Sequence, residues 1–523
     1  MKLRTVAPKA LRHALCVLAL MWTGLVNGQP FFFATDTTNY IRAADVAVYV
    51  ASHHRFSTIW TDRYKGQLET KAGGSAARSE AAPEQISRRS ANDLRQGVIM
   101  GGRSPYIGAL IYAGYLAGDF WPFLLFQAVI GYLLILLALR RFGVTSPATV
   151  TLITVALAAT TSLPTYVSLL MADAFASFGI LAFLLLATPG DLSKKELAFL
   201  AGVLAISVSA HMTHIMMLIG MVGALALLAL LRAVPKPSRR AWVAGIGGIV
   251  IGLLSVQLTA EATKLALGKK PQLMPLLTAR FIADGPGKRF IDSGCDRGRF
   301  EICHVPIGRP DSAPLILFGT TPDTGAYMLG DAGQRLRMGQ QDTAFALAVA
   351  KYDPAGVMWA MTRNTFRQFV WIDYDGLNQN CFAAGPDCWA SLPAPIRAEL
   401  QTTPSGRGLW PQAAMNALLY ATVGASLLLF AVALPVIGRR RTPDWILLRE
   451  WLVLTLVAML VCSFFGGAVS DPQYRYQGRL IWLVPFFAAI AFCLWRRALA
   501  SKPSVSGTEA APASATRISA AAS

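Results

Sequence analysis

An acidic side chain directly after the first apolar run is the strongest candidate for chemistry in this sequence. Asp36 follows the aromatic run Phe31-Phe32-Phe33 and precedes Thr37-Thr38-Asn39-Tyr40. Because aromatic residues favour the membrane–water interface, we expect Asp36 at the outer mouth of a helix bundle. A carboxylate in that position can accept a proton from an incoming hydroxyl or amine. The alternative is that Asp36 caps a helix that begins near Thr38.

Two other segments carry side chains suited to an anionic group such as phosphate. Their candidates are Arg103, Tyr106, Arg475, Tyr476 and Arg479. A guanidinium group binds phosphate through paired, charge-assisted hydrogen bonds. For Arg103 the alternative is an ordinary anchor to lipid headgroups. Arg475 and Arg479 fall on the expected outer side of the membrane, whereas the basic residues that set membrane orientation lie on the cytoplasmic side. Orientation therefore does not explain these two arginines, and a binding role is favoured.

Three ionisable residues inside apolar stretches are further candidates. An ionisable side chain within a span is costly unless it faces a cavity or a partner, so Asp173 is expected to face a site at the outer surface. His211 and His214 are three positions apart and, if helical, share one face. They could bind phosphate as imidazolium or a metal ion as neutral rings. The alternative is that they are hydrogen-bonded polar residues at a helix turn.

Seven cysteines divide into two groups. Three of them, Cys16, Cys462 and Cys493, lie in apolar runs and are expected to act as small apolar side chains. The other four lie in one polar stretch: Cys295, Cys303, Cys381 and Cys388. An even number in one loop predicts two disulfides of undetermined pairing and an oxidising compartment, with four free cytosolic thiols as the alternative. Short spacings typical of zinc sites are absent from the sequence.

The composition indicates the kind of molecule that must position these residues. Of the 523 residues, 54% are hydrophobic and 15% are charged, whereas soluble domains average about 25% charged. The net charge of +19 comes largely from short basic clusters next to apolar runs, which is the pattern of cytoplasmic loops rather than of a nucleic-acid binder. We therefore expect an all-α polytopic membrane protein that does not bind nucleic acid.

Apolar runs of about 20 residues predict about ten transmembrane helices. They cover residues 11–28, 121–139, 148–163, 166–188, 196–210, 213–232, 241–259, 413–437, 447–468 and 480–495. With a cytoplasmic N-terminus the basic clusters fall inside, and the cysteine-rich stretch falls outside without having been used to set the orientation. The run 105–118 is too short for a span and is expected to form an interfacial or re-entrant helix on the outer face.

This topology divides the chain into four parts. They are a seven-span module over 1–259 with a first outer loop at 29–120, an outer domain with disulfides over 260–412, three C-terminal spans over 413–497, and a tail over 498–523. The tail is of low complexity and is expected to be disordered in the cytoplasm. The stretch 64–97 of the first loop is polar and is expected to be mobile.

The arrangement resembles the GT-C superfamily of membrane glycosyltransferases, which use polyprenyl-phosphate-linked sugars and include protein O-mannosyltransferases and lipid A aminoarabinose transferases. The span layout over about 11–495 is similar, with long outer loops after the first and seventh spans. Asp36-Thr37-Thr38-Asn39-Tyr40 looks like the acidic first-loop motif of that family, Arg103-Ser104-Pro105-Tyr106 is similar to its Arg–Pro–Tyr motif, and Arg475-Tyr476 resembles its late Arg–Tyr pair. Asp173 falls where members often have an acidic residue in the fourth span.

The resemblance implies an enzyme of the bacterial inner membrane with both termini in the cytoplasm. It implies that Asp36 is the catalytic base and that Arg103, His211, His214 and Arg475 hold the phosphate of the donor. The donor would be a polyprenyl-phosphate-linked sugar, and the acceptor a glycan, lipid or protein. No cofactor is required, although some members use a divalent metal ion; the single acid at Asp36 leaves that requirement open.

Three other functions fit parts of the same pattern. An O-antigen polymerase or ligase also has about ten spans and a large outer loop, but relies on basic residues without a first-loop carboxylate. A lipid or polysaccharide transporter would show paired repeats and broken helices at the midplane of the membrane. A non-catalytic relative would differ from an enzyme by as little as one residue.

Overall fold

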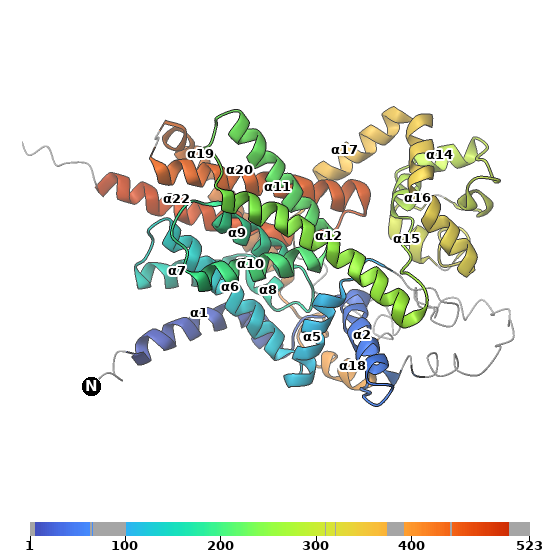
Figure 1. The fold of residues 1–523 in the computed structure, drawn as a ribbon, viewed down its shortest axis with the longest axis horizontal. Helices are drawn as coiled ribbons and strands as arrows, with labels where there is room; N and C mark the ends of the chain where they lie inside the picture. The colour runs from blue at the N-terminus through green and yellow to red at the C-terminus, as the bar shows by residue number, and fades with distance from the viewer. Residues whose placement is uncertain are drawn as a thin grey trace, which may run out of the picture.

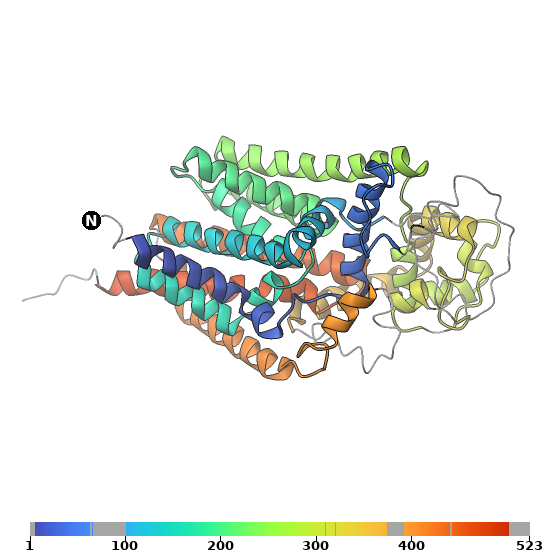
Figure 2. The ribbon, with the colours of Figure 1, turned by 90° about the horizontal axis from the view of Figure 1, so that it is seen from below.

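The computed structural model describes residues 6–62, 65, 101–308, 310–319, 321–373, 392–439 and 442–500. Within these ranges every regular element is a helix, and an isolated parallel bridge joins Phe31 to Leu169. Figures 1 and 2 show a bundle of long helices with a smaller helical domain at one end. The predicted all-α class is confirmed for the described residues.

Seven helices in the described part of the chain are long and apolar enough to cross a membrane. They are α1 (Val6–Asn27), α6 (Trp121–Arg141), α11 (Met212–Leu230), α12 (Arg239–Leu267), α19 (Gln412–Arg439), α20 (Pro443–Ser463, continued by the π-helix η4, Phe464–Val469) and α21 with α22 (Arg475–Ile481 and Leu483–Ala500). The chain is therefore a multi-pass membrane protein. The start of α1 and the end of α22 lie at the end of the bundle opposite the small domain (Figure 2).

Shorter helices occupy the other three predicted spans. They are α7 (Pro147–Thr160), the pair α8 (Leu163–Val167) and α9 (Ala174–Ala187), and α10 (Lys194–Ala210). All 14 residues of α9 are buried, so this helix lies inside the bundle and is not exposed to lipid. A helix shielded by its neighbours need not match the thickness of the bilayer by itself, which accounts for the short length of α9.

The prediction of one continuous helix over 166–188 is wrong, because residues 168–173 between α8 and α9 are not helical. Non-helical backbone within a membrane-spanning bundle requires hydrogen-bond partners inside the protein. The backbone N–H of Phe31 donates to the carbonyl of Ser168, and that of Leu170 donates to the carbonyl of Phe31. The Gln127 amide of α6 donates to the carbonyls of Val167 and Leu169. The break is thereby bonded directly to the segment that leads to Asp36.

Two helices that follow the first span in the chain carry candidate residues. The helix α2 (Ala34–Ala51) begins three residues after Phe31, and α5 (Pro105–Gly118) confirms the helix predicted over 105–118. They pack closely, because a β-carbon on Gly108 would lie 2.4 Å from the carbonyl oxygen of Tyr40. The stretch 66–100 between them lies outside the described residues, so its predicted mobility stays a prediction.

The second long loop forms the small domain, which we call the outer domain and define as residues 276–370. It contains α13 (Leu276–Ala283), α14 (Pro286–Asp292), the 3-10 helix η3 (Glu301–His304), α15 (Ala313–Phe318), α16 (Ala332–Tyr352) and α17 (Pro354–Val370). Its core is separate from that of the bundle and includes Phe281, Phe300, Tyr327 and Phe345. The short helix α18 (Ala394–Leu400) follows and packs with the bundle core.

The aromatic residues near the end of the outer domain lie in different environments. Trp359 and Phe366 are two-thirds exposed, and Phe369 packs against the core of the bundle. Trp371 contacts Tyr474 edge to face. Tyr374, Phe382 and Trp389 lie outside the described residues.

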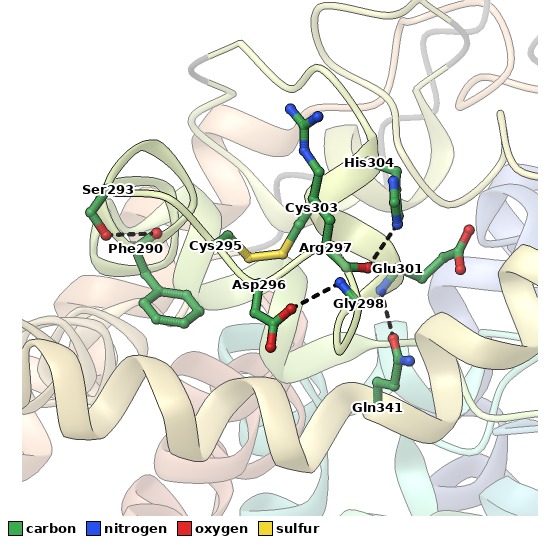
Figure 3. Close-up of a disulfide and its surroundings, with 10 residues drawn as sticks. All are labelled: Phe290, Ser293, Cys295, Asp296, Arg297, Gly298, Glu301, Cys303, His304 and Gln341. Carbon is green, nitrogen blue, oxygen red and sulfur yellow. Dashed lines mark hydrogen bonds between the residues drawn. A yellow bond between two sulfur atoms is a disulfide. The ribbon is translucent and has the colours of Figure 1, made fainter.

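One of the predicted disulfides is present in the outer domain. Cys295 and Cys303 are bonded beside α16, where the backbone N–H of Glu301 donates to the Gln341 side chain (Figure 3). Cys381 and Cys388 lie outside the described residues, so their pairing stays a prediction, as does the disordered tail. The three remaining cysteines are free, and two of them, Cys16 and Cys462, are fully buried.

Candidate functional site

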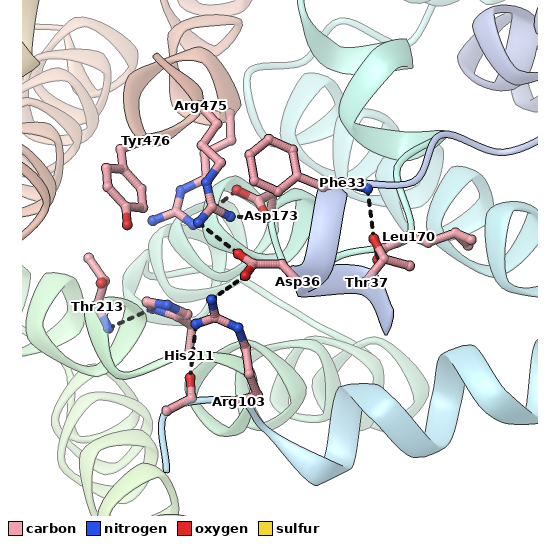
Figure 4. Close-up of polar contacts among 12 residues, drawn as sticks. Phe33, Asp36, Thr37, Arg103, Leu170, Asp173, His211, Thr213, Arg475 and Tyr476 are labelled. Atoms are coloured by element: carbon pink, nitrogen blue, oxygen red, sulfur yellow. Dashed lines mark hydrogen bonds and ion pairs between the residues drawn. The ribbon is translucent and has the colours of Figure 1, made fainter. Parts of the chain in front are cut away.

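Asp36 lies in the first turn of α2 and does not cap it. The residue before the helix is Phe33, whose backbone is extended, and the Asp36 backbone N–H donates to the Phe33 carbonyl. Thr37 fastens this turn by donating to the Leu170 carbonyl at the helix break, 3.1 Å away. The capping interpretation is therefore wrong, and the carboxylate points instead toward two guanidinium groups (Figure 4).

Arg103 and Arg475 bind the two oxygens of Asp36 separately. A terminal nitrogen of Arg103 pairs with Oδ1, and Nη2 of Arg475 lies 3.1 Å from Oδ2. Arg103 precedes α5, and its neighbour Ser104 donates to the Ser209 carbonyl at the end of α10. Arg475 is the first residue of α21. Segments more than 400 residues apart in the sequence thus meet on one carboxylate.

The line of alternating charges continues inward to Asp173, which lies directly before α9. Its carboxylate is 3.6 Å from Nη1 of Arg475 and 3.3 Å from Nη1 of Arg479. Arg479 also donates to the Cys462 sulfur, at 3.6 Å. We call this set the charged line and define it as Arg103, Asp36, Arg475, Asp173 and Arg479. Its formal charge is +1, because three arginines face two aspartates.

Exposure falls steadily along the charged line. The side chains of Arg103 and Asp36 are 32% and 13% exposed, whereas those of Asp173 and Arg479 are 2% and 1% exposed. An incoming group would therefore meet the Arg103 end first. The Nε atoms of Arg103, Arg475 and Arg479 are buried and have no hydrogen-bond partner among the described residues. Buried donors without a partner are uncommon, so the three arginines keep unused capacity for an anion.

Aromatic rings cover the guanidinium groups. The centre of the Arg475 guanidinium lies 4.5 Å from the centroid of the Phe33 ring. The Tyr476 ring contacts both Arg475 and Arg479, at 5.1 and 5.2 Å. Tyr40 lies one helical turn after Asp36, and burial raises the pKa of Tyr40 to about 12 although Arg103 acts in the opposite direction. The Tyr40 phenol is therefore a hydrogen-bond donor at neutral pH.

Competing effects set the protonation of Asp36. Burial raises the pKa of this carboxyl, but the charges and hydrogen bonds of Arg103 and Arg475 outweigh burial and hold the pKa below its usual value. Asp36 is therefore ionised at neutral pH, as a general base must be.

His211 and His214 would share a helical face only if both were helical, and His211 is not. They are hydrogen-bonded polar residues at the turn between α10 and α11, with their ring centroids 5.7 Å apart. His211 has an extended backbone between α10 and α11, and its Nδ1 accepts from the Thr213 backbone N–H, which starts α11. His214 is buried and donates from Nδ1 to the Ser207 carbonyl, 2.8 Å away. Burial, the neighbouring His214 and the arginines lower the pKa of His211 well below its usual value. A neutral His211 offers an N–H donor near the site but no positive charge for phosphate.

The remaining predicted residues divide between the site and its surroundings. Tyr476 lies in the site, whereas Tyr106 is turned away and donates to the Ser255 carbonyl of α12. Sequence reasoning missed Phe33, Tyr40 and Cys462. The four-residue spacing of Asp36 and Tyr40 on a helix could have indicated Tyr40, but the contacts of Phe33 and Cys462 are made with residues distant in the chain. The described residues contain no group of three or more His, Cys, Asp or Glu side chains that could hold a metal ion.

Comparisons of the chain with family models, with curated proteins and with solved structures found no match.

Proposed function

We propose that this protein is an integral membrane glycosyltransferase of the bacterial inner membrane. It transfers a sugar from a polyprenyl-phosphate donor to an acceptor on the outer side of the membrane. The observation that carries the proposal is the direct contact of Asp36 with Arg103 and Arg475. A group suited to remove a proton and groups suited to hold a phosphate lie within reach of one reacting centre, as such a transfer requires.

The reaction fits the roles of these side chains. The acceptor oxygen forms a bond to the anomeric carbon of the sugar while the bond from that carbon to the phosphate oxygen breaks, with inversion. Asp36 takes the proton of the acceptor hydroxyl. The polyprenyl phosphate leaves with the bonding electrons, and its added negative charge is stabilised by Arg103, Arg475 and Arg479. The activated bond is supplied by the donor, so no nucleotide site is needed.

The contacts of Asp36 indicate an order of events. Both oxygens of the carboxylate are paired with guanidinium groups, so the base is masked. A phosphate competes for the same guanidinium groups with a larger negative charge. Binding of the donor would therefore draw the arginines from Asp36 and free an oxygen for the acceptor proton. This predicts that the donor binds before the acceptor.

The order of elements along the chain supports the same proposal. Long outer segments follow α1 and α12, as the GT-C superfamily would have them after its first and seventh spans. The finer expectation of ten spans includes α7, α9 and α10, which need their neighbours to be stable in a bilayer. We retain that count as part of the proposal.

The direct test is turnover of labelled polyprenyl-phosphate sugars by the purified protein with membrane acceptors. Asp36→Asn should abolish turnover. A matched control is Asp45→Asn, because Asp45 is a buried carboxylate on the same helix whose partners are the hydroxyls of Thr58, Thr61 and Tyr112. Folded Asp45→Asn protein should keep its turnover, although it unfolds more easily.

The outcomes separate the candidate functions. Equal turnover by the wild type and by Asp36→Asn would favour a polymerase or ligase that relies on basic residues. Movement of the labelled lipid across the bilayer without a transferred sugar would indicate a transporter. A wild type that turns over none of the donors would count against the proposal.

A further inference from the structure

The short segment that precedes Arg475 is held by the outer domain. It comprises residues 470–474 and joins the π-helix η4 to α21. The Gln368 side chain on α17 makes two hydrogen bonds to the backbone of Gln473, donating to its carbonyl at 2.9 Å and accepting from its N–H at 2.7 Å. Both atoms of the amide are used, so the position of Gln473 follows that of α17. Arg475 is two residues farther on.

A buried ion cluster holds the other end of the same segment. Arg280 of α13 pairs with Asp471 and also with Asp284. Its Nη2 and Nε lie 2.8 and 2.9 Å from the two carboxylate oxygens of Asp284. Asp284 is 2% exposed and accepts in addition from Arg363 and from the Asn364 amide at 2.7 Å. Because Arg280 and Asp284 at its centre are buried, the geometry of the cluster is more restrictive than that of a surface ion pair.

Close backbone packing forms a third connection. A β-carbon on Gly467 of η4 would lie 2.4 Å from the Asn364 carbonyl oxygen of α17, and one on Gly466 would lie 2.6 Å from the Tyr476 ring. The π-helix thus lies between the outer domain and the site without intervening space. π-helical turns are rare and often occur at functional sites.

We propose that Asp471 and Gln368 are positioning residues, through which the outer domain keeps the Arg475 guanidinium in place for a phosphate. This inference rests on the proposed function, since it assigns Arg475 to the phosphate of the donor. Neither residue touches the charged line. Their effect on phosphate binding therefore passes through the segment 470–474 to Arg475.

The test measures binding of farnesyl phosphate, a short polyprenyl monophosphate, to the full-length protein in detergent. Arg475→Gln should weaken binding about tenfold to a hundredfold, as loss of a charged hydrogen bond does. Asp471→Asn and Gln368→Ala should each weaken binding severalfold to about tenfold by loosening Arg475. Asp471→Glu, which keeps the carboxylate, should recover part of the loss.

The double variant Asp471→Asn with Arg475→Gln decides between positioning and general damage. If Asp471 acts through Arg475, the double variant binds as weakly as Arg475→Gln alone, because the two effects are not additive. The matched control is Arg337→Gln, which breaks the exposed Arg337–Glu301 pair elsewhere in the outer domain and should leave binding unchanged. Gln368→Ala leaves the ion cluster intact, so it serves as the positioning variant if Asp471→Asn does not fold.

Each result has a distinct meaning. An unchanged affinity in Arg475→Gln would refute the phosphate site, and the positioning proposal with it. A weakened Arg475→Gln combined with additive effects, or with no effect of Asp471→Asn and Gln368→Ala, would overturn the positioning proposal alone.

Discussion

At the scale of single residues, the masked state of Asp36 is the feature with the clearest consequences. An ionised carboxylate with a lowered pKa is a weak base while both guanidinium groups remain in place. Its strength would rise when a phosphate removes one of them. Under the proposed function, the site would couple the strength of the base to occupation by the donor, which would limit proton abstraction when no donor is bound.

The first prediction concerns the pH dependence of activity. A base works only when ionised, so activity falls as the pH drops through the pKa of Asp36, which lies below its usual value of 3.8 in the protein. Arg103→Gln removes one stabilising charge while burial remains, so the pKa rises. The acidic limb of kcat/KM against pH should move upward by about one to three units. An unmoved limb, beside an Arg337→Gln control, would show that Arg103 does not set this pKa.

A second prediction concerns Asp173, which separates two arginines. Asp173→Asn leaves buried guanidinium groups without their shared counter-charge, and removal of one partner of a buried pair costs about 3–5 kcal/mol. The unfolding midpoint in detergent should fall accordingly. The control is Asp292→Asn, because Asp292 is half exposed and pairs with Lys288 on the same helix turn, so its loss should cost about 1 kcal/mol or less.

At the scale of elements, the site depends on close helix contacts and on one break. The bridge between Phe31 and Leu169 fixes the start of α2 against the segment 168–173. A continuous helix there would have carried Asp173 away from the backbone to which α2 is bonded. The break at 168–173 and the first turn of α2 together place the carboxylates of Asp36 and Asp173 beside Arg475.

The contact between α2 and α5 allows a direct test at this scale. Gly108→Ala would place a β-carbon 2.4 Å from the Tyr40 carbonyl oxygen, so α5 must shift and Arg103 with it. We expect a loss of about 1–3 kcal/mol in stability, as for other overpacked contacts, and weaker binding of farnesyl phosphate. Gly118→Ala, on the same helix, meets only Pro122 at 3.6 Å and should change neither quantity. Equal behaviour of the two variants would contradict the close packing.

At the scale of the whole molecule, the membrane topology decides whether the site faces the outer side of the membrane, where the proposed transfer would take place. The disulfide Cys295–Cys303 lies in the outer domain. The start of α1 and the end of α22 lie at the opposite end of the bundle. An oxidising compartment around the outer domain is consistent with that disulfide. The charged line lies near the outer domain, because Arg475 follows the segment 470–474 that α17 holds.

Reporter fusions in a bacterial host test this arrangement. Alkaline phosphatase, which is active only in the periplasm, should be active when fused after Tyr352 and inactive after Gly143, Gly190 or Lys236. A further fusion after Ser162, between α7 and α8, is the most informative, because it should be active only if α7 crosses the membrane. Inactivity after both Ser162 and Gly190 would remove two of the ten proposed spans.

Much of this protein followed from the sequence because the bilayer restricts the choice of structure. Apolar runs of sufficient length predict helices at membrane depth whatever their neighbours, since each helix satisfies its own backbone hydrogen bonds. The helix α5 and the split of the run 197–231 at His211 were predicted from the apolar runs and are confirmed, whereas the outer position of the cysteine-rich loop stays a prediction. The candidate Asp173 was found because a charge within an apolar span is costly and needs a reason. Asp36, Arg103 and Arg475 were found from their positions next to the expected membrane interface.

The tertiary structure alone decided which residues meet. The break at 168–173 could not be read from an apolar run, because its hydrogen bonds come from Phe31 and Gln127, which are distant in the sequence. The shared helical face considered for His211 and His214 is absent for a local reason, because His211 is not helical and its Nδ1 accepts from the Thr213 backbone N–H at the start of α11. The pairing of Asp36 with Arg475 and the hold of the outer domain on residues 470–474 depend on contacts between distant segments. Local pattern carries no information about such contacts, because they are fixed only when the helices pack.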